Sequence, residues 1–172
     1  MSNTVEKSID VQIPIKAVYN QWTQFEEFPE FMDGVREVKQ LDDKRLHWRA
    51  VIGVVEKQWE AVIVEQTPET RIAWRSATGA ENSGIVSFLP IDGGTRVTAR
   101  ITYDTEGLVE KAGDAMGLVS RRVEGDLQRF KEFIESRGSE TGAWRGEIHA
   151  GKVKSGTDAG LGGASSTGTA SV

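Results

Sequence analysis

The feature that most constrains the fold is the long stretch from Val35 to Tyr103, in which apolar and polar residues mostly alternate. A period of two places successive side chains on opposite faces of a strand, whereas a helix repeats every three to four residues. Turn-forming residues divide the stretch into six segments, and the short connections between them predict sequential antiparallel hairpins. The expected strands are approximately 35–41, 44–52, 56–66, 70–77, 84–90 and 95–104.

Elements on either side of this stretch complete an α+β domain. Residues 4–12 alternate as one more strand, and Pro14 is followed by apolar residues at helical spacing. A second short helix is expected across the Phe-rich segment 25–32. The last element, at approximately 108–137, carries a helical apolar stripe. We therefore expect seven antiparallel strands, two short helices after the first strand, and a curved sheet around a long C-terminal helix.

The predicted sheet has one apolar face, and we expect an apolar pocket between this face and the long helix. Three Trp residues on that face alternate with or lie near small alanines, which leaves room beside the rings. The residues expected to bind a ligand are Trp48, Trp59, Trp74, Ser76, Phe88 and Tyr103 from the sheet, with Met116 and Val119 from the helix. An alternative in which the aromatic side chains fill the core completely stays open. Each Trp needs a partner for its indole N–H if it is buried.

The composition excludes several kinds of chemistry. The chain has 172 residues, a formal net charge of -5, no cysteine, and only His47 and His149 as imidazoles. Disulfides, thiolate nucleophiles, Cys-ligated zinc and a His-rich metal site are therefore excluded, and no cofactor or metal is expected. A mildly acidic chain with scattered basic residues argues against nucleic acid or an anionic membrane as a partner. The N-terminus lacks an apolar signal core and no apolar run approaches membrane-spanning length, so we expect a cytoplasmic protein.

The composition changes sharply at Gly138. Residues 139–172 are rich in Gly, Ser and Thr, and such a segment buries too little apolar surface to offset the entropy lost on ordering. We therefore expect a folded domain over residues 1–138 and a flexible tail over residues 139–172. Trp144 stands out in this tail, either as a solvated residue or as the anchor of a docking segment.

The order of elements and several short motifs resemble a known superfamily. The motifs are Val18-Tyr-Asn-Gln-Trp22 after Pro14, Phe28-Pro-Glu-Phe-Met32, Trp59, Ile72-Ala-Trp-Arg-Ser76, Gly84-Ile-Val-Ser-Phe88, Thr95-Arg-Val-Thr98 and the segment 121–134. With them, residues 1–138 resemble the START-like helix-grip superfamily, also called SRPBCC, and within it the bacterial polyketide cyclase/dehydrase-type family. The resemblance implies a concave sheet that grips the final helix around a deep cavity. Members of the superfamily bind sterols, lipids, quinones, polyketides or other apolar molecules there.

The first hypothesis for function is therefore binding of a small apolar ligand, such as a lipid, a quinone or a polyketide-like molecule. Cyclisation and dehydration of a poly-β-ketone is the alternative, and a protein-interaction or co-chaperone-like module is a second alternative. Enzymes of the superfamily use polar cavity groups, commonly Arg, Tyr, Trp or His, with water. The predicted inner face of the sheet offers Tyr103 and Ser76 but no clear Arg or His, since His47 alternates with Trp48 and points outward. Tyr103 is thus a weak catalytic candidate, a proton donor and a poor base.

Overall fold

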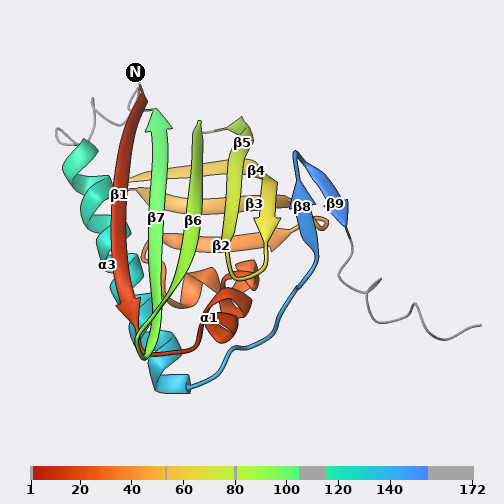
Figure 1. Cartoon of the computed structure of the whole chain (residues 1–172). Helices are drawn as coiled ribbons and strands as arrows, with labels where there is room; N and C mark the ends of the chain where they lie inside the picture. The colour runs from red at the N-terminus through yellow and green to blue at the C-terminus, as the bar shows by residue number, and fades with distance from the viewer. Residues whose placement is uncertain (1, 53, 80, 105–114, 155–172) are drawn as a thin grey trace, which may run out of the picture.

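A computed structural model of the chain describes residues 2–52, 54–79, 81–104 and 115–154 (Figure 1). No helix within these residues is long and apolar enough to cross a membrane. The helices are α1 (Ile15–Trp22), the 3-10 helix η1 (Phe25–Glu30) and α3 (Ala115–Arg137). The strands are β1 (Ser2–Val11), β2 (Val35–Gln40), β3 (Arg45–Ile52), β4 (Val55–Thr67), β5 (Arg71–Gly79), β6 (Asn82–Ile91), β7 (Gly94–Asp104), β8 (Glu147–His149) and β9 (Lys152–Lys154).

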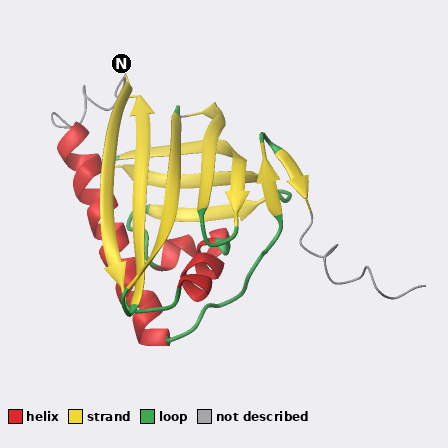
Figure 2. Ribbon diagram, in the orientation of Figure 1, coloured by secondary structure: helices red, strands yellow, loops and turns green. Residues whose placement is uncertain are grey.

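The first seven strands form one antiparallel sheet in the order β1-β7-β6-β5-β4-β3-β2. This arrangement confirms the predicted hairpins and the α+β helix-grip fold. Figure 1 shows β1, β7, β6 and β5 side by side, while β4, β3 and β2 run across behind them. The long helix α3 lies along β1, and α1 with η1 lies at one end of the sheet (Figure 2).

The sheet is curved, and irregular pairing along β4 accounts for part of its curvature. The register between β4 and β5 shifts between Glu60 and Ala61, and again between Ile63 and Glu65. An extra residue on one strand bends that strand and increases its local twist. Two such shifts in one strand therefore contribute to the curvature of the sheet.

The core lies between this concave face and α3. Inner-face residues of the strands are buried, as the alternation predicts, and they meet apolar residues of α3 at helical spacing. The buried residues of α3 are Val123, Leu127, Phe130 and Ile134. Trp22 and Phe31 pack against Phe130, with ring centroids 5.0 and 5.1 Å from it. The Phe-rich segment after α1 therefore closes the core at the end of the sheet where α1 lies.

The predicted long helix is confirmed from Ala115 onward. Its expected first turns, at residues 108–114, lie outside the described residues.

The segment 139–154 differs from the expectation of a flexible tail. This segment, named here the C-terminal strap, leaves α3, passes α1 and ends in the β8–β9 hairpin (Figure 2). In β8, Ile148 is fully buried and pairs with Gln66 of β4. The expected domain boundary at residue 138 is therefore wrong for the strap, while residues 155–172 lie outside the described residues.

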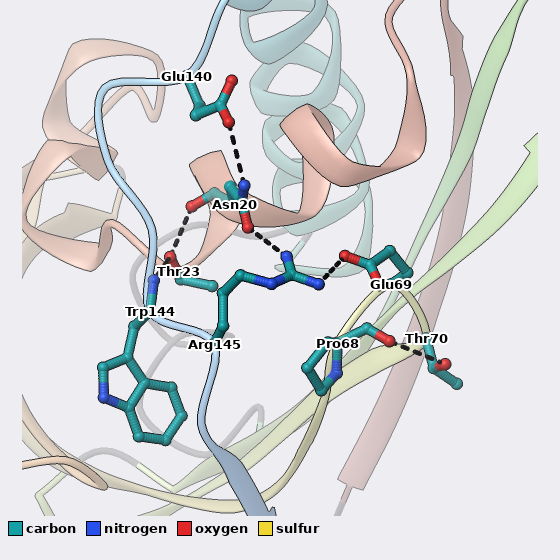
Figure 3. Close-up of polar contacts among 8 residues, drawn as sticks. All are labelled: Asn20, Thr23, Pro68, Glu69, Thr70, Glu140, Trp144 and Arg145. Atoms are coloured by element: carbon teal, nitrogen blue, oxygen red, sulfur yellow. Dashed lines mark hydrogen bonds and ion pairs between the residues drawn. The ribbon is translucent and has the colours of Figure 1, made fainter. Parts of the chain in front are cut away.

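Polar side chains hold the strap against α1. Asn20 donates from Nδ2 to Glu140 Oε1 at 3.0 Å and accepts at Oδ1 from Arg145 Nη1 at 2.6 Å (Figure 3). The Arg145 guanidinium also pairs with the carboxylate of Glu69 and lies over the ring of Tyr19. These contacts join residues at least 76 positions apart, so the glycine-rich composition did not reveal them.

Candidate functional site

A cavity of about 470 Å³ lies between the concave face of the sheet and α3. Its walls come from all the layers of the domain: η1 and the end of α1, the inner face of the strands, and one side of α3. The apolar lining residues are Trp22, Phe25, Phe28, Met32, Val35, Leu46, Trp48, Ala50, Trp59, Ile63, Ile72, Trp74, Val86, Ala99, Ile101, Tyr103, Val119, Val123 and Leu127. The volume is within the range of small-molecule sites.

Five of the eight predicted ligand-binding residues line this cavity: Trp48, Trp59, Trp74, Tyr103 and Val119. Ser76 and Phe88 do not belong to its lining. Ser76 Oγ instead accepts a hydrogen bond from the backbone N–H of Asn82 at 3.1 Å.

The remaining two predictions have different outcomes. Phe88 packs edge-on against Tyr19, with ring centroids 5.5 Å apart, and so belongs to the solid core under α1. Met116 lies in α3, but its side chain is outside the described residues.

Three indole rings line the cavity from the sheet, and we call them the tryptophan wall (Trp48, Trp59 and Trp74). Trp48 and Trp59 are directly opposite in the β3–β4 register, and their rings stack at 5.7 Å with an interplanar angle of 8°. Such stacking follows from alternation, since opposed residues of neighbouring strands share a face. The wall therefore consists of a stacked indole pair and a third indole ring.

Hydrogen bonding differs within the tryptophan wall. Trp74 donates from Nε1 to Asn82 Oδ1 at 3.3 Å, and its ring lies over Gly84, where a Cβ atom would overlap it. The Nε1 atoms of Trp48 and Trp59 are buried and have no hydrogen-bond partner in the described part of the chain. Because these two donors are buried, they are not accessible from the cavity.

Charged groups missing from the sequence-based prediction line the cavity from α3. Arg122 and Asp126 are four residues apart and so lie on the same side of the helix. Arg122 donates from Nη1 to the backbone carbonyls of Asp33 at 2.6 Å and Val51 at 2.8 Å. Gly34, with φ +84°, makes room for this guanidinium because a Cβ atom there would overlap it.

Asp126 has an unusual electrostatic environment. Its Oδ1 accepts from the backbone N–H of Asp33 at 3.0 Å and from Arg129 Nη2 at 2.5 Å. Burial raises the pKa of Asp126 from 3.8 to about 6. The two hydrogen bonds and the charges of Arg129 and Arg122 act in the opposite direction, but the effect of burial is larger. The carboxyl group therefore titrates close to neutral pH.

The expectation of no clear arginine on the inner face of the sheet therefore missed Arg122, which lines the cavity from α3. It considered the inner face of the sheet, where the alternation is clear, and took from α3 only its apolar stripe. Arg122 and Asp126 flank the buried Val123, at the border of that stripe. Their backbone partners at 33 and 51 could not be inferred from local sequence.

Further polar residues line the end of the cavity where β4 and β6 begin and β7 ends. These residues are Lys57, Glu81, Asn82 and Asp104. Within the described residues, no group of three or more His, Asp or Glu side chains could hold a metal ion. His47 is not part of the cavity lining.

The curved antiparallel sheet, the long helix that it encloses and the cavity between them define a helix-grip fold. A START superfamily protein from Mycobacterium smegmatis shares this fold, with a TM-score of 0.58 at 13% identity over 73% of this chain and 97% of that one. The chain belongs to the family described as polyketide cyclase / dehydrase and lipid transport, whose model matches residues 11–132. This finding confirms the resemblance inferred from the motifs.

Relatives and solved structures agree with this assignment. The chain is 46% identical over 146 residues to an uncharacterized 17.2 kDa protein from the melC2-rnhH intergenic region of Streptomyces lincolnensis, covering 84% of this chain and 97% of that protein. It is 33% identical to DR_A0006 of Deinococcus radiodurans, with a TM-score of 0.62, 78% of this chain covered and 99% of the other. The ZhuI aromatase/cyclase of Streptomyces sp. R1128 shares the fold with a TM-score of 0.67 at 15% identity, over 80% of this chain and 96% of that one.

Proposed function

We propose that the protein binds a small apolar ligand, of lipid, quinone or polyketide-like character, in the cavity between the sheet and α3. The observation that carries this proposal is the cavity of about 470 Å³ with an aromatic and aliphatic lining. Ligand sites of this size are commonly lined by apolar side chains with a few polar groups that orient the ligand. The family description, which includes lipid transport, supports the same reading.

The experiment is a titration of apolar aromatic and lipid probes followed by tryptophan fluorescence and thermal unfolding. Trp22, Trp48, Trp59 and Trp74 line the cavity, so an occupant should change their emission. At a free ligand concentration of 100 times Kd, binding stabilises the native state by about 2.7 kcal/mol. For a chain of this size, that is a rise in Tm of roughly 5–10 °C.

A blocked variant provides the control. Ala99 lines the cavity, so Ala99→Phe should abolish the response by filling the space. Ala77 is exposed, so Ala77→Phe should respond as the wild type does. If no lipid, quinone or aromatic probe changes emission or Tm in the wild type, the ligand-binding proposal fails.

A second candidate function is proton transfer on the bound ligand, as a cyclase or dehydratase would require. The specific observation that favours it is Asp126, a cavity-lining carboxyl group with a pKa of about 6. A group that titrates near the working pH can both accept and return a proton, whereas an ordinary tyrosine near pKa 10 is a poor base.

The test is cyclisation of a reactive poly-β-ketone mimic, compared with the uncatalysed rate. An enzyme of this kind should accelerate the reaction by orders of magnitude, and Asp126→Asn should remove most of that acceleration. Tyr103→Phe tests the weaker sequence-based candidate in the same assay. A wild-type rate equal to the uncatalysed rate would leave ligand binding as the function.

A further inference from the structure

The cavity has one place where a donor and an acceptor lie together on α3. Arg122 and Asp126 are one helical turn apart, and both line the cavity. The tryptophan wall offers no indole donor from Trp48 or Trp59 to a ligand, because the N–H groups of both residues are buried. A ligand oriented by hydrogen bonds must therefore find its partners elsewhere in the lining.

Each member of this pair uses only part of its hydrogen-bonding capacity within the described residues. Arg122 binds the carbonyls of Asp33 and Val51 through Nη1, and its Nε and Nη2 have no hydrogen-bond partner there. Asp126 accepts two hydrogen bonds at Oδ1, and its Oδ2 has none in the same ranges. The backbone contacts fix both side chains, so the remaining guanidinium donors and the second carboxylate oxygen are the groups that a ligand would bind.

We propose, on the basis of the ligand-binding function above, that the ligand is a planar aromatic molecule with a neutral hydroxyl group. In this arrangement the hydroxyl donates to Asp126 Oδ2 and accepts from the Arg122 guanidinium. The aromatic body lies against the tryptophan wall, because aromatic rings pack on indole rings by offset stacking or edge-to-face contact.

The charges of the pair favour a neutral hydroxyl over an ionised group. A carboxylate would accept from Arg122 but would be repelled by Asp126, and a cation would face Arg122 with Arg129 close behind it. A phenol, an enol or an alcohol satisfies both partners without adding charge. Leaving either charged partner unmatched in this partly buried site would cost affinity.

The test compares matched probes in equilibrium binding to the full-length chain. The probes are 2-naphthol, 2-methylnaphthalene of nearly the same shape, and 2-methoxynaphthalene, which accepts a hydrogen bond but cannot donate one. We expect 2-naphthol to bind at least about 10-fold more tightly than 2-methylnaphthalene, since hydrogen bonds to charged groups are among the stronger ones. The methoxy compound should lose most of this advantage.

The ratio of the Kd values for 2-naphthol and 2-methylnaphthalene also distinguishes two effects of a substitution. Loss of the hydroxyl contacts changes this ratio, whereas general structural damage weakens both probes alike. Arg122→Gln and Asp126→Asn should each bring the ratio of 2-naphthol to 2-methylnaphthalene affinity close to one, even if both probes bind more weakly. The matched control is Lys131→Gln, which removes another α3 cation that binds a backbone carbonyl, that of Asp10, but does not line the cavity. This control should keep the wild-type ratio.

Three results would overturn this inference while leaving the ligand-binding function intact. The first is equal binding of 2-naphthol and 2-methylnaphthalene by the wild type. The second is a hydroxyl preference that survives both Arg122→Gln and Asp126→Asn. The third is binding of a lipid or quinone when none of the three probes binds, which would rule out the planar aromatic class. If nothing binds at all, the proposed function itself fails.

Discussion

Replacing Ile148 by alanine tests whether the C-terminal strap is part of the folded domain. Ile148 has an exposed fraction of 0% and packs into the main core cluster. Removing a fully buried isoleucine side chain beyond Cβ costs about 2–5 kcal/mol, because both the transfer free energy and a cavity contribute. For a chain of this length we expect a fall in Tm of roughly 5–15 °C.

The assay is thermal and urea unfolding followed by circular dichroism, with Val153→Ala as the control. Val153 lies in the same hairpin but is 37% exposed, so its truncation should change stability by no more than about 0.5 kcal/mol. An Ile148→Ala protein that unfolds at the wild-type temperature would show that β8 does not pack as described. The sequence-based expectation of a flexible tail would then be restored.

Three further predictions concern single positions. Gly84→Ala should lower the free energy of unfolding by about 1–3 kcal/mol and shift tryptophan emission, because the new methyl group overlaps the ring of Trp74. Unchanged emission would refute the predicted overlap. Folding raises the pKa of Asp126 from 3.8 to about 6. Protonation of Asp126 therefore adds to the free energy of unfolding, fully below pH 4, and this added stability is lost as pH rises through 6. Tm measured from pH 4 to 7 should therefore improve for Asp126→Asn relative to the wild type, and parallel curves would contradict the shift. Ala150 has φ +50° in the two-residue turn between β8 and β9, a conformation that asparagine adopts more readily than alanine. Ala150→Asn should therefore raise the free energy of unfolding in urea by roughly 1 kcal/mol, and a decrease would contradict the turn geometry.

The strands were predictable because burial is one-sided along most of the sheet. Leu46, Ala50, Ile63 and Ile72 are all buried where the alternation places them. The register shifts along β4 were not predictable, because a bulge changes pairing without interrupting an apolar pattern. These shifts curve the wall and so decide which inner residues reach the cavity.

The candidate site was only partly predictable, for two physical reasons. Alternation identifies the inner face of a strand but not whether a residue meets the cavity or another side chain. Trp74 and Phe88 both lie on that face, yet only Trp74 lines the cavity. The polar pair on α3 was missed because arginine and aspartate at the border of an apolar stripe also fit an exposed helix surface.

The strap was misjudged because composition describes a whole segment, whereas packing depends on single residues. Residues 139–172 are rich in glycine and serine, but one buried isoleucine and several hydrogen bonds to α1 hold the first half in place. Gln21 is fully buried and exchanges two hydrogen bonds with Thr141. Such pairings depend on the tertiary structure and leave no periodic signal.

The position of β8 has a consequence for how copies of the chain behave at high concentration. Past Ile63, β4 no longer pairs with β3. The backbone of β4 there pairs with the strap instead, and the N–H of Gly151 donates to the carbonyl of Val64 at 2.9 Å. An uncovered strand edge is a template for intermolecular pairing and aggregation. The hairpin replaces that edge with β9, a strand of three residues that carries Lys152 and Lys154. Short edges that carry lysine resist such pairing. The strap therefore has two effects: it packs on the domain, and it protects the chain against self-association.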